Sequence, residues 1–167
     1  MASSATGLEV VTMRILDYLS AEQVDFEVRH HRTRYTALEE AAAEHLSGRM
    51  FAKTVVVSVD GEYVMLVLPA SCRVDLGRVS ALLDGEARMA TESELAELFA
   101  DCELGAEPPF GSRYGLRTLV DEHLAGQLAI AFRAGSHREV VILRWDDYAR
   151  LEWPRVCAIA LGEGVMV

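Results

Sequence analysis

Residues 51–68 read FAKTVVVSVDGEYVMLVL, and this stretch determines the fold class. Two apolar runs, 51–59 and 62–68, are rich in β-branched residues and predict two strands. Asp60 and Gly61 lie between them and favour the positive φ angles of a tight hairpin turn. The sequence therefore predicts a β-hairpin with Lys53 near the start of its first strand.

Helical and strand-like patterns flank this hairpin on both sides. Apolar residues at three- and four-residue spacing, and two capping-box patterns at Thr36–Glu39 and Thr91–Glu94, predict helices over residues 8–19, 36–48, 75–83, 91–100 and 146–151. Alternating or apolar runs predict further strands over residues 25–30, 116–120, 128–132 and 139–143. We expect an α+β fold: a single compact domain whose mixed, mostly antiparallel sheet has flanking helices.

The length and composition limit the function classes. With 167 residues the chain suits one domain, which we expect over residues 8–160, after a flexible N-terminus (1–7) and before a C-terminal tail (161–167). No apolar run reaches the roughly 18 residues of a membrane helix. Three cysteines without a C-x-x-C pair argue against a disulfide framework and favour a cytoplasmic setting.

The net charge of −10 argues against a general nucleic-acid coat, and no DNA partner is expected. A local basic patch at residues 28–38 is the exception; it is either a solvated loop or part of a nucleic-acid contact. Neither the adjacent His30 and His31 nor Asp121 and His123 form a recognisable ligand motif, so no metal site and no cofactor are expected.

Lys53 is the one lysine beside fifteen arginines. An ammonium differs from a guanidinium in size, hydration and donor geometry, which makes Lys53 the first residue to suspect of a chemical role. The alternative is a strand-edge lysine that discourages aggregation.

A second unusual segment is Leu104–Gly111, where Pro108 and Pro109 exclude a regular helix or central strand. Its G-x-x-x-P pattern, from Gly105 to Pro109, is either a tight surface turn or a rigid loop whose amides face a substrate. The second reading suits the stabilisation of a developing oxyanion.

Four motifs in order resemble the YbaK-like aminoacyl-tRNA editing family, which includes free-standing deacylases and the editing insertion of prolyl-tRNA synthetase. They are residues 51–57, the loop 105–111, the strand 116–121 and the turn 134–137. The resemblance spans about residues 8–160. It implies hydrolysis of a mischarged amino acid from tRNA, most plausibly a small one on tRNA for proline.

The resemblance also implies roles for individual residues. Lys53 would hold the terminal phosphate or sugar, the loop amides would face the ester, and His137 would orient water or contact the substrate amino group. The catalytic residues expected are Lys53, Gly105, Ala106, Pro109 and His137. The substrate-binding residues expected are His31, Tyr35, Thr54, Gly111, Gly135 and Ser136. The partner expected first is the acceptor end of an aminoacyl-tRNA, and the second candidate partner is an aminoacyl-tRNA synthetase.

Glu107 departs from what the chemistry requires, because it introduces a negative charge into the loop. Its side chain must turn away from the ester or tune specificity by repulsion. Two other function classes stay open. One is a catalytically silent module that binds tRNA, a nucleotide or a protein; the other is a small-molecule sensor with a closed apolar pocket.

Overall fold

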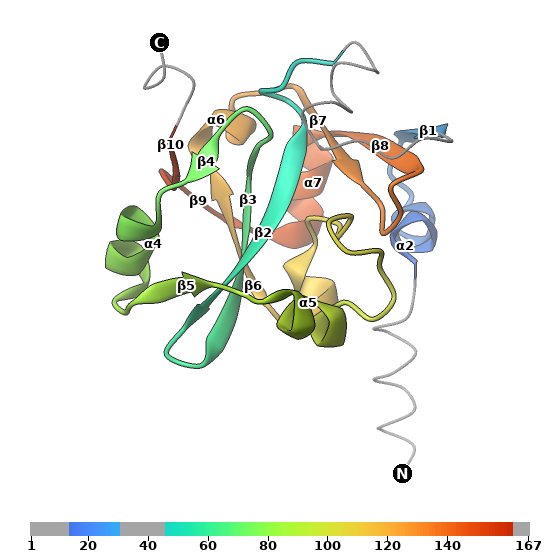
Figure 1. Cartoon of the computed structure of the whole chain (residues 1–167). Coiled ribbons are helices and arrows are strands. Elements are labelled where there is room, and N and C mark those ends of the chain that lie inside the picture. Colours follow the sequence, from blue (N-terminus) through green and yellow to red (C-terminus); the bar gives the residue numbers. More distant parts are fainter. Residues whose placement is uncertain (1–13, 31–45, 162–167) are drawn as a thin grey trace.

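A computed structural model describes residues 14–30 and 46–161 of the chain (Figure 1). The longer strands are β1 (Phe26–His30), β2 (Ala52–Val59), β3 (Glu62–Pro69), β6 (Arg117–Asp121), β7 (Ala129–Arg133) and β8 (Glu139–Arg144). Shorter strands are β4 (Arg73–Val74), β5 (Ala87–Met89), β9 (Arg155–Cys157) and β10 (Ala160–Leu161). The helices are α2 (Ile15–Ala21), α4 (Leu76–Leu83), α5 (Glu92–Leu98), α6 (Glu122–Ala125), α7 (Trp145–Glu152) and the 3₁₀ turn η1 (Gly111–Tyr114).

The hairpin expected from residues 51–68 is confirmed. β2 and β3 pair antiparallel over their whole length, with Val59 opposite Glu62. Asp60 and Gly61 have φ angles of 51° and 82°, as a two-residue turn with two left-handed positions requires.

Two sheets build most of the domain. The larger has five strands in the order β5-β2-β3-β6-β9, and the smaller has three in the order β1-β8-β7. The pairs β3–β6 and β6–β9 are parallel, whereas the remaining pairs in both sheets are antiparallel. With helices packed around these sheets, the expected α+β class with a mixed, mostly antiparallel sheet is confirmed.

Side chains of β2 alternate between two apolar layers. Ala52 and Val56 belong to the main core, which includes Tyr148 of α7 and the aromatic rings of Phe110 and Phe132. Val57 packs on the other face, in the layer covered by α4. This alternation decides which way every other β2 side chain points.

The sequence patterns located the long elements and missed the short ones. The expected capping box at Thr91 and Glu94 is present, whereas β4, β5, β9, β10 and α6 were not predicted, because two to four residues carry no measurable periodicity. The expected helix at residues 36–48 lies almost wholly outside the described residues, as do residues 8–13 of the first helix. The boundaries of the domain at residues 7 and 160 stay a prediction. In the described part of the chain, no helix is both long and apolar enough to span a membrane.

Candidate functional site

The proline loop (residues 104–111) and the glycine turn (residues 134–138) are bonded to each other. The N–H of Glu103, just before the loop, donates to the carbonyl of Gly135 over 2.8 Å. The N–H of Gly135 donates to the carbonyl of Ala106, also over 2.8 Å. Two segments about 30 residues apart therefore form one unit.

His137 adds two further bonds between the turn and the loop. Its backbone N–H donates to Oε1 of Glu103 over 3.0 Å, and its ring Nε2 lies 2.6 Å from the carbonyl oxygen of Leu104. Because a carbonyl oxygen carries no proton, Nε2 must be the donor. In the neutral ring Nδ1 is then an acceptor; it is buried and has no hydrogen-bond partner among the described residues.

The two glycines at this junction have left-handed backbones. Gly105 has φ +86° and Gly135 has φ +93°, values that L side chains adopt at a cost. A Cβ at Gly105 would lie 3.4 Å from Cε1 of His137. That distance is ordinary van der Waals contact, so glycine at position 105 is required by the left-handed turn of the chain and not by lack of space.

The loop amides do not all face outward as expected. The N–H of Ala106 donates to the carbonyl of Glu103 over 3.0 Å, and Ala106 is fully buried. The N–H of Gly105 donates to Oε2 of Glu107 over 2.7 Å. In this structure the expectation that the Ala106 amide faces a substrate is wrong, because the chain itself supplies its acceptor.

Pro109 is connected to the main core by a hydrogen bond and by the packing of the next residue. The buried hydroxyl of Tyr148 donates to its carbonyl oxygen over 2.6 Å, and the ring of the next residue, Phe110, meets those of Phe132 and Tyr148 edge to face. Pro109 therefore anchors the loop.

Close packing explains why residue 111 is a glycine. A Cβ there would lie 2.4 Å from Oγ1 of Thr118, and Gly111 is buried. The absence of a side chain at position 111 permits β6 to pass close to the backbone. A role of Gly111 in substrate binding stays a prediction.

Lys53 lies on the face of β2 that carries Phe51 and Val57, opposite to Ala52. Phe51 forms a parallel bridge with Ala131 of β7, so Lys53 extends in the same direction as Arg133, two residues further along β7. The guanidinium of Arg133 donates to the Gly105 carbonyl over 3.4 Å. Lys53 itself lies opposite Leu68 in the hairpin and near Cys72, and its placement beside the proline loop stays a prediction.

The environment of Lys53 is apolar. Its side chain is half-buried, and within the described residues no hydrogen bond or ion pair holds its ammonium. Burial lowers the pKa of Lys53, because desolvation disfavours the charged form. Thr54, its neighbour, points to the opposite face of the strand.

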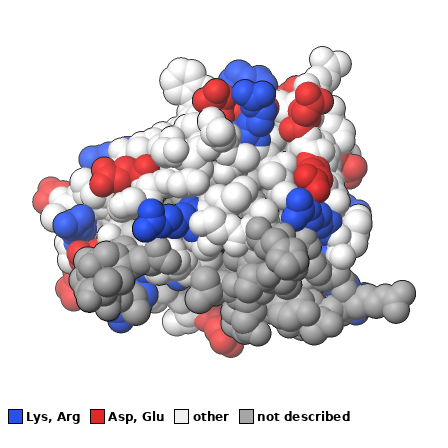
Figure 2. Space-filling model, turned by 90° about the horizontal axis from the view of Figure 1, so that it is seen from above, with Lys and Arg blue, Asp and Glu red and all other residues white. Residues whose placement is uncertain are grey.

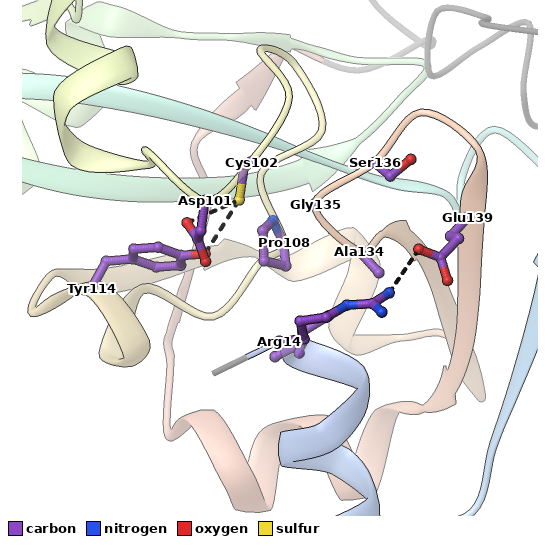
Figure 3. A pocket seen from close by; sticks show the side chains of 10 residues that line it. Arg14, Asp101, Cys102, Pro108, Tyr114, Ala134, Gly135, Ser136 and Glu139 are labelled. Carbon is purple, nitrogen blue, oxygen red and sulfur yellow. Dashed lines mark hydrogen bonds and ion pairs between the residues drawn. The ribbon is translucent and has the colours of Figure 1, made fainter. Parts of the chain in front are cut away.

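A cavity of about 260 Å³ opens between the loop, the turn and α2 (Figure 3). Its polar side chains are paired with each other: Arg14 with Glu139, and Asp101 with the hydroxyl of Tyr114. Cys102 also lines it, and burial raises the pKa of this thiol to about 12, so it is not a ready nucleophile.

Three expected substrate-binding residues remain: Ser136, His31 and Tyr35. Ser136 lines the same cavity, and its hydroxyl accepts a bond from the Arg138 N–H over 3.1 Å. His31 and Tyr35 lie outside the described residues. Among the residues that are described, no group of three His, Cys, Asp or Glu side chains gathers as metal ligands would.

Three residues of the site were missed by sequence reasoning: Arg133, Tyr148 and Glu152. Glu152 is buried and accepts bonds from Ser112 N (3.0 Å), Ser112 Oγ (2.6 Å) and Thr118 Oγ1 (2.6 Å). Tyr148 and Glu152 are one helical turn apart on α7, a spacing that places both on one face. No signal in the sequence links that face to the proline loop.

Comparisons with known proteins agree with this geometry. Residues 31–151 match the model of the aminoacyl-tRNA editing domain. The chain is 32% identical over 164 residues to the multifunctional Ser/Thr-tRNA deacylase ProXp-y of Escherichia coli (strain K12), covering 93% of this chain and 96% of that protein.

Two solved structures share the fold. A hypothetical protein superposes with a TM-score of 0.81 at 18% identity, covering 89% of this chain and all of the other. A candidate trans-editing enzyme for prolyl tRNA synthetase superposes with a TM-score of 0.78 at 24% identity, covering 91% and 98%. The resemblance found in the sequence is thus confirmed, and the chain belongs to the aminoacyl-tRNA editing family of hydrolases.

Proposed function

We propose that this protein is a free-standing deacylase that removes a small non-cognate amino acid from a mischarged tRNA. The bonded unit of proline loop and glycine turn, in a chain whose residues 31–151 match the editing domain, is the observation that carries the proposal. This unit forms a rigid surface against which the ester of the substrate can bind. An enzyme gains most of its rate from such preorganised positioning and electrostatics.

The proposed reaction is the hydrolysis of the ester between the amino acid and the terminal ribose. Water adds to the carbonyl carbon, and the bond from that carbon to the ribose oxygen then breaks. The amino acid leaves as a carboxylate, and the tRNA keeps the hydroxyl. The second ribose hydroxyl of the substrate is close enough to its own ester to direct the water.

Lys53 and His137 have separate proposed roles. The ammonium of Lys53, for which the described residues supply no hydrogen bond or ion pair, is proposed to attract the phosphate or sugar of the terminal nucleotide. His137 is proposed to orient the water or to contact the substrate amino group. Its Nε2 is committed to Leu104, and its Nδ1, the remaining ring nitrogen, is buried in this structure.

The tRNA is proposed to bind mainly through its acceptor end. In Figure 2, acidic and basic side chains alternate on the coloured surface, and they do not form a broad basic face. A duplex-wide contact would require many neutralised phosphates, which suits neither this surface nor the net charge of −10. We also propose that the protein acts in the cytoplasm and that a partner synthetase helps it to bind the tRNA.

The substrates proposed first are serine and threonine esters, because the Escherichia coli relative is named for them. Our sequence-based expectation of tRNA for proline remains part of the proposal. A synthetase pocket cannot strongly reject small amino acids by binding alone, so a second hydrolytic site is useful.

The test is deacylation by the purified chain of a panel of mischarged tRNAs. Serine, threonine and alanine are each attached to tRNA for proline, and serine and threonine also to their own tRNAs. We expect hydrolysis of at least one small ester well above the spontaneous rate. Binding of every tRNA without hydrolysis would instead establish the silent-module alternative.

A further inference from the structure

The carboxylate of Glu107 turns back onto its own loop. Its Oε2 accepts the Gly105 N–H at 2.7 Å, and Glu107 is only 7% exposed. Burial raises the pKa of this carboxyl, whereas the backbone amides of the loop and the nearby His137 lower it. A buried carboxyl without hydrogen bonds would be costly, so the contact with Gly105 is part of the loop's structure.

The Gly105 peptide is held from both sides. Glu107 accepts from its N–H, and Arg133 donates to its carbonyl over 3.4 Å. Between these two contacts Gly105 adopts φ +86° and faces the imidazole of His137, which a Cβ at Gly105 would approach to 3.4 Å. If either contact were lost, Gly105 could adopt other backbone conformations, because glycine has more of them available than other residues.

We propose that Glu107 is a positioning residue for the hydrolysis. Its side chain fixes Gly105, and through Gly105 it fixes the distance between the proline loop and His137. Glu107 touches neither water nor ester. This inference rests on the proposed function, and it explains how a negative residue is compatible with an ester-binding loop: the charge is satisfied inside the loop.

Two substitutions at position 107 separate positioning from charge. Glu107→Gln retains a side-chain oxygen that can accept the Gly105 N–H, whereas Glu107→Ala retains none. In single-turnover deacylation we expect the Gln variant to stay within about threefold of the wild type. The Ala variant should lose on the order of 10- to 100-fold in the maximal single-turnover rate constant, the scale of a small misplacement, with the half-saturating enzyme concentration nearly unchanged.

Glu97→Ala is the matched control, because it removes an exposed carboxylate on α5. It should retain the wild-type single-turnover rate constant and half-saturating enzyme concentration. Thermal melts of all variants identify any that fail to fold. If Glu107→Ala does not fold, the comparison of Glu107→Gln with the wild type still tests the inference.

A second measurement does not depend on the substrate. The ¹H–¹⁵N resonance of the Gly105 amide should be shifted downfield and exchange slowly in the wild type and in Glu107→Gln. In Glu107→Ala it should move upfield and exchange faster. If no tRNA is hydrolysed at all, the proposed function fails while this measurement still tests the bond.

Three outcomes would overturn the inference. Wild-type activity in Glu107→Ala would remove any positioning role. Loss of activity in Glu107→Gln with an unchanged Gly105 resonance would make the charge itself essential, as for a general base. An unprotected Gly105 amide in the wild type would show that the bond does not form.

Discussion

The buried hydroxyl of Tyr148 donates a 2.6 Å hydrogen bond to the carbonyl oxygen of Pro109. One turn later on α7, Glu152 accepts the N–H of Ser112 over 3.0 Å. These two bonds connect the last helix to both sides of Phe110, whose ring lies in the main core. The proline loop is therefore attached to the core at its C-terminal end and to the glycine turn at its N-terminal end.

Removal of the Tyr148 hydroxyl tests the first attachment. Tyr148→Phe leaves the buried Pro109 carbonyl without its donor, which costs about 1–3 kcal/mol in the free energy of unfolding. Urea unfolding followed by tryptophan fluorescence measures this cost. Tyr18→Phe is the control, because no hydrogen bond is formed by the Tyr18 hydroxyl within the described residues; its stability should stay within about 0.5 kcal/mol. Equal effects in the two variants would contradict the assigned bond.

Glu152 makes stability depend on pH in a definite direction. Burial raises its pKa above the ordinary value of 4.5, so the carboxyl ionises more easily in the unfolded chain. Its contribution to stability therefore falls as pH rises from about 4.5 through the folded pKa, and is constant above it. The stability of the wild type minus that of Glu152→Gln should decrease over this range in urea titrations between pH 4 and 8.

Glu94 supplies a control of opposite sign. Its hydrogen bonds with Arg88 and the Thr91 N–H lower its pKa, so its contribution is present above the unfolded value and is lost as pH falls. The difference between the wild type and Glu94→Gln should not decrease as pH rises. A parallel decrease for both carboxyls would contradict the burial of Glu152 as the cause.

Lys53→Met should separate function from stability. The substitution removes the proposed contact with the terminal nucleotide, and we expect deacylation to fall on the order of 100-fold. Because burial lowers the pKa of Lys53, its ammonium disfavours the folded state at neutral pH, and the Met variant should have an equal or higher Tm.

The control for Lys53 is Arg117→Met, which removes an exposed cation paired with Glu62. It should keep full activity. Loss of stability together with activity in Lys53→Met would indicate a structural role for the lysine and leave its proposed contact unsupported.

Gly105→Ala tests whether deacylation needs the left-handed backbone of the proline loop at this position. Gly61 has nearly the same φ angle, +82°, but it lies in the hairpin turn, and no atom of the described residues comes within 4 Å of a Cβ placed there. Both Ala variants should lose about 1 kcal/mol of stability from backbone strain. Only Gly105→Ala should also lose deacylation, on the order of 100-fold. Equal activities of the two variants would exclude a catalytic need for the Gly105 backbone conformation.

Much of the fold was predictable because its signals are local. The turn at Asp60-Gly61 depends on two residues, and the β2–β3 register follows directly from it. The capping box at Thr91 is likewise local. By contrast, strand β9 has three residues and exists only because it pairs with β6, so no sequence pattern could locate it.

The sequence by itself determined which residues are chemically unusual: one lysine, two adjacent prolines and the glycines of the loop and turn. Tertiary structure alone decided what they contact. The bond from Gly135 to Ala106 and the burial of Glu107 depend on β7 bringing the turn to the loop. Residue spacing specifies how side chains project from one element, whereas distances between elements are determined by core packing and by the hydrogen bonds available once water is excluded.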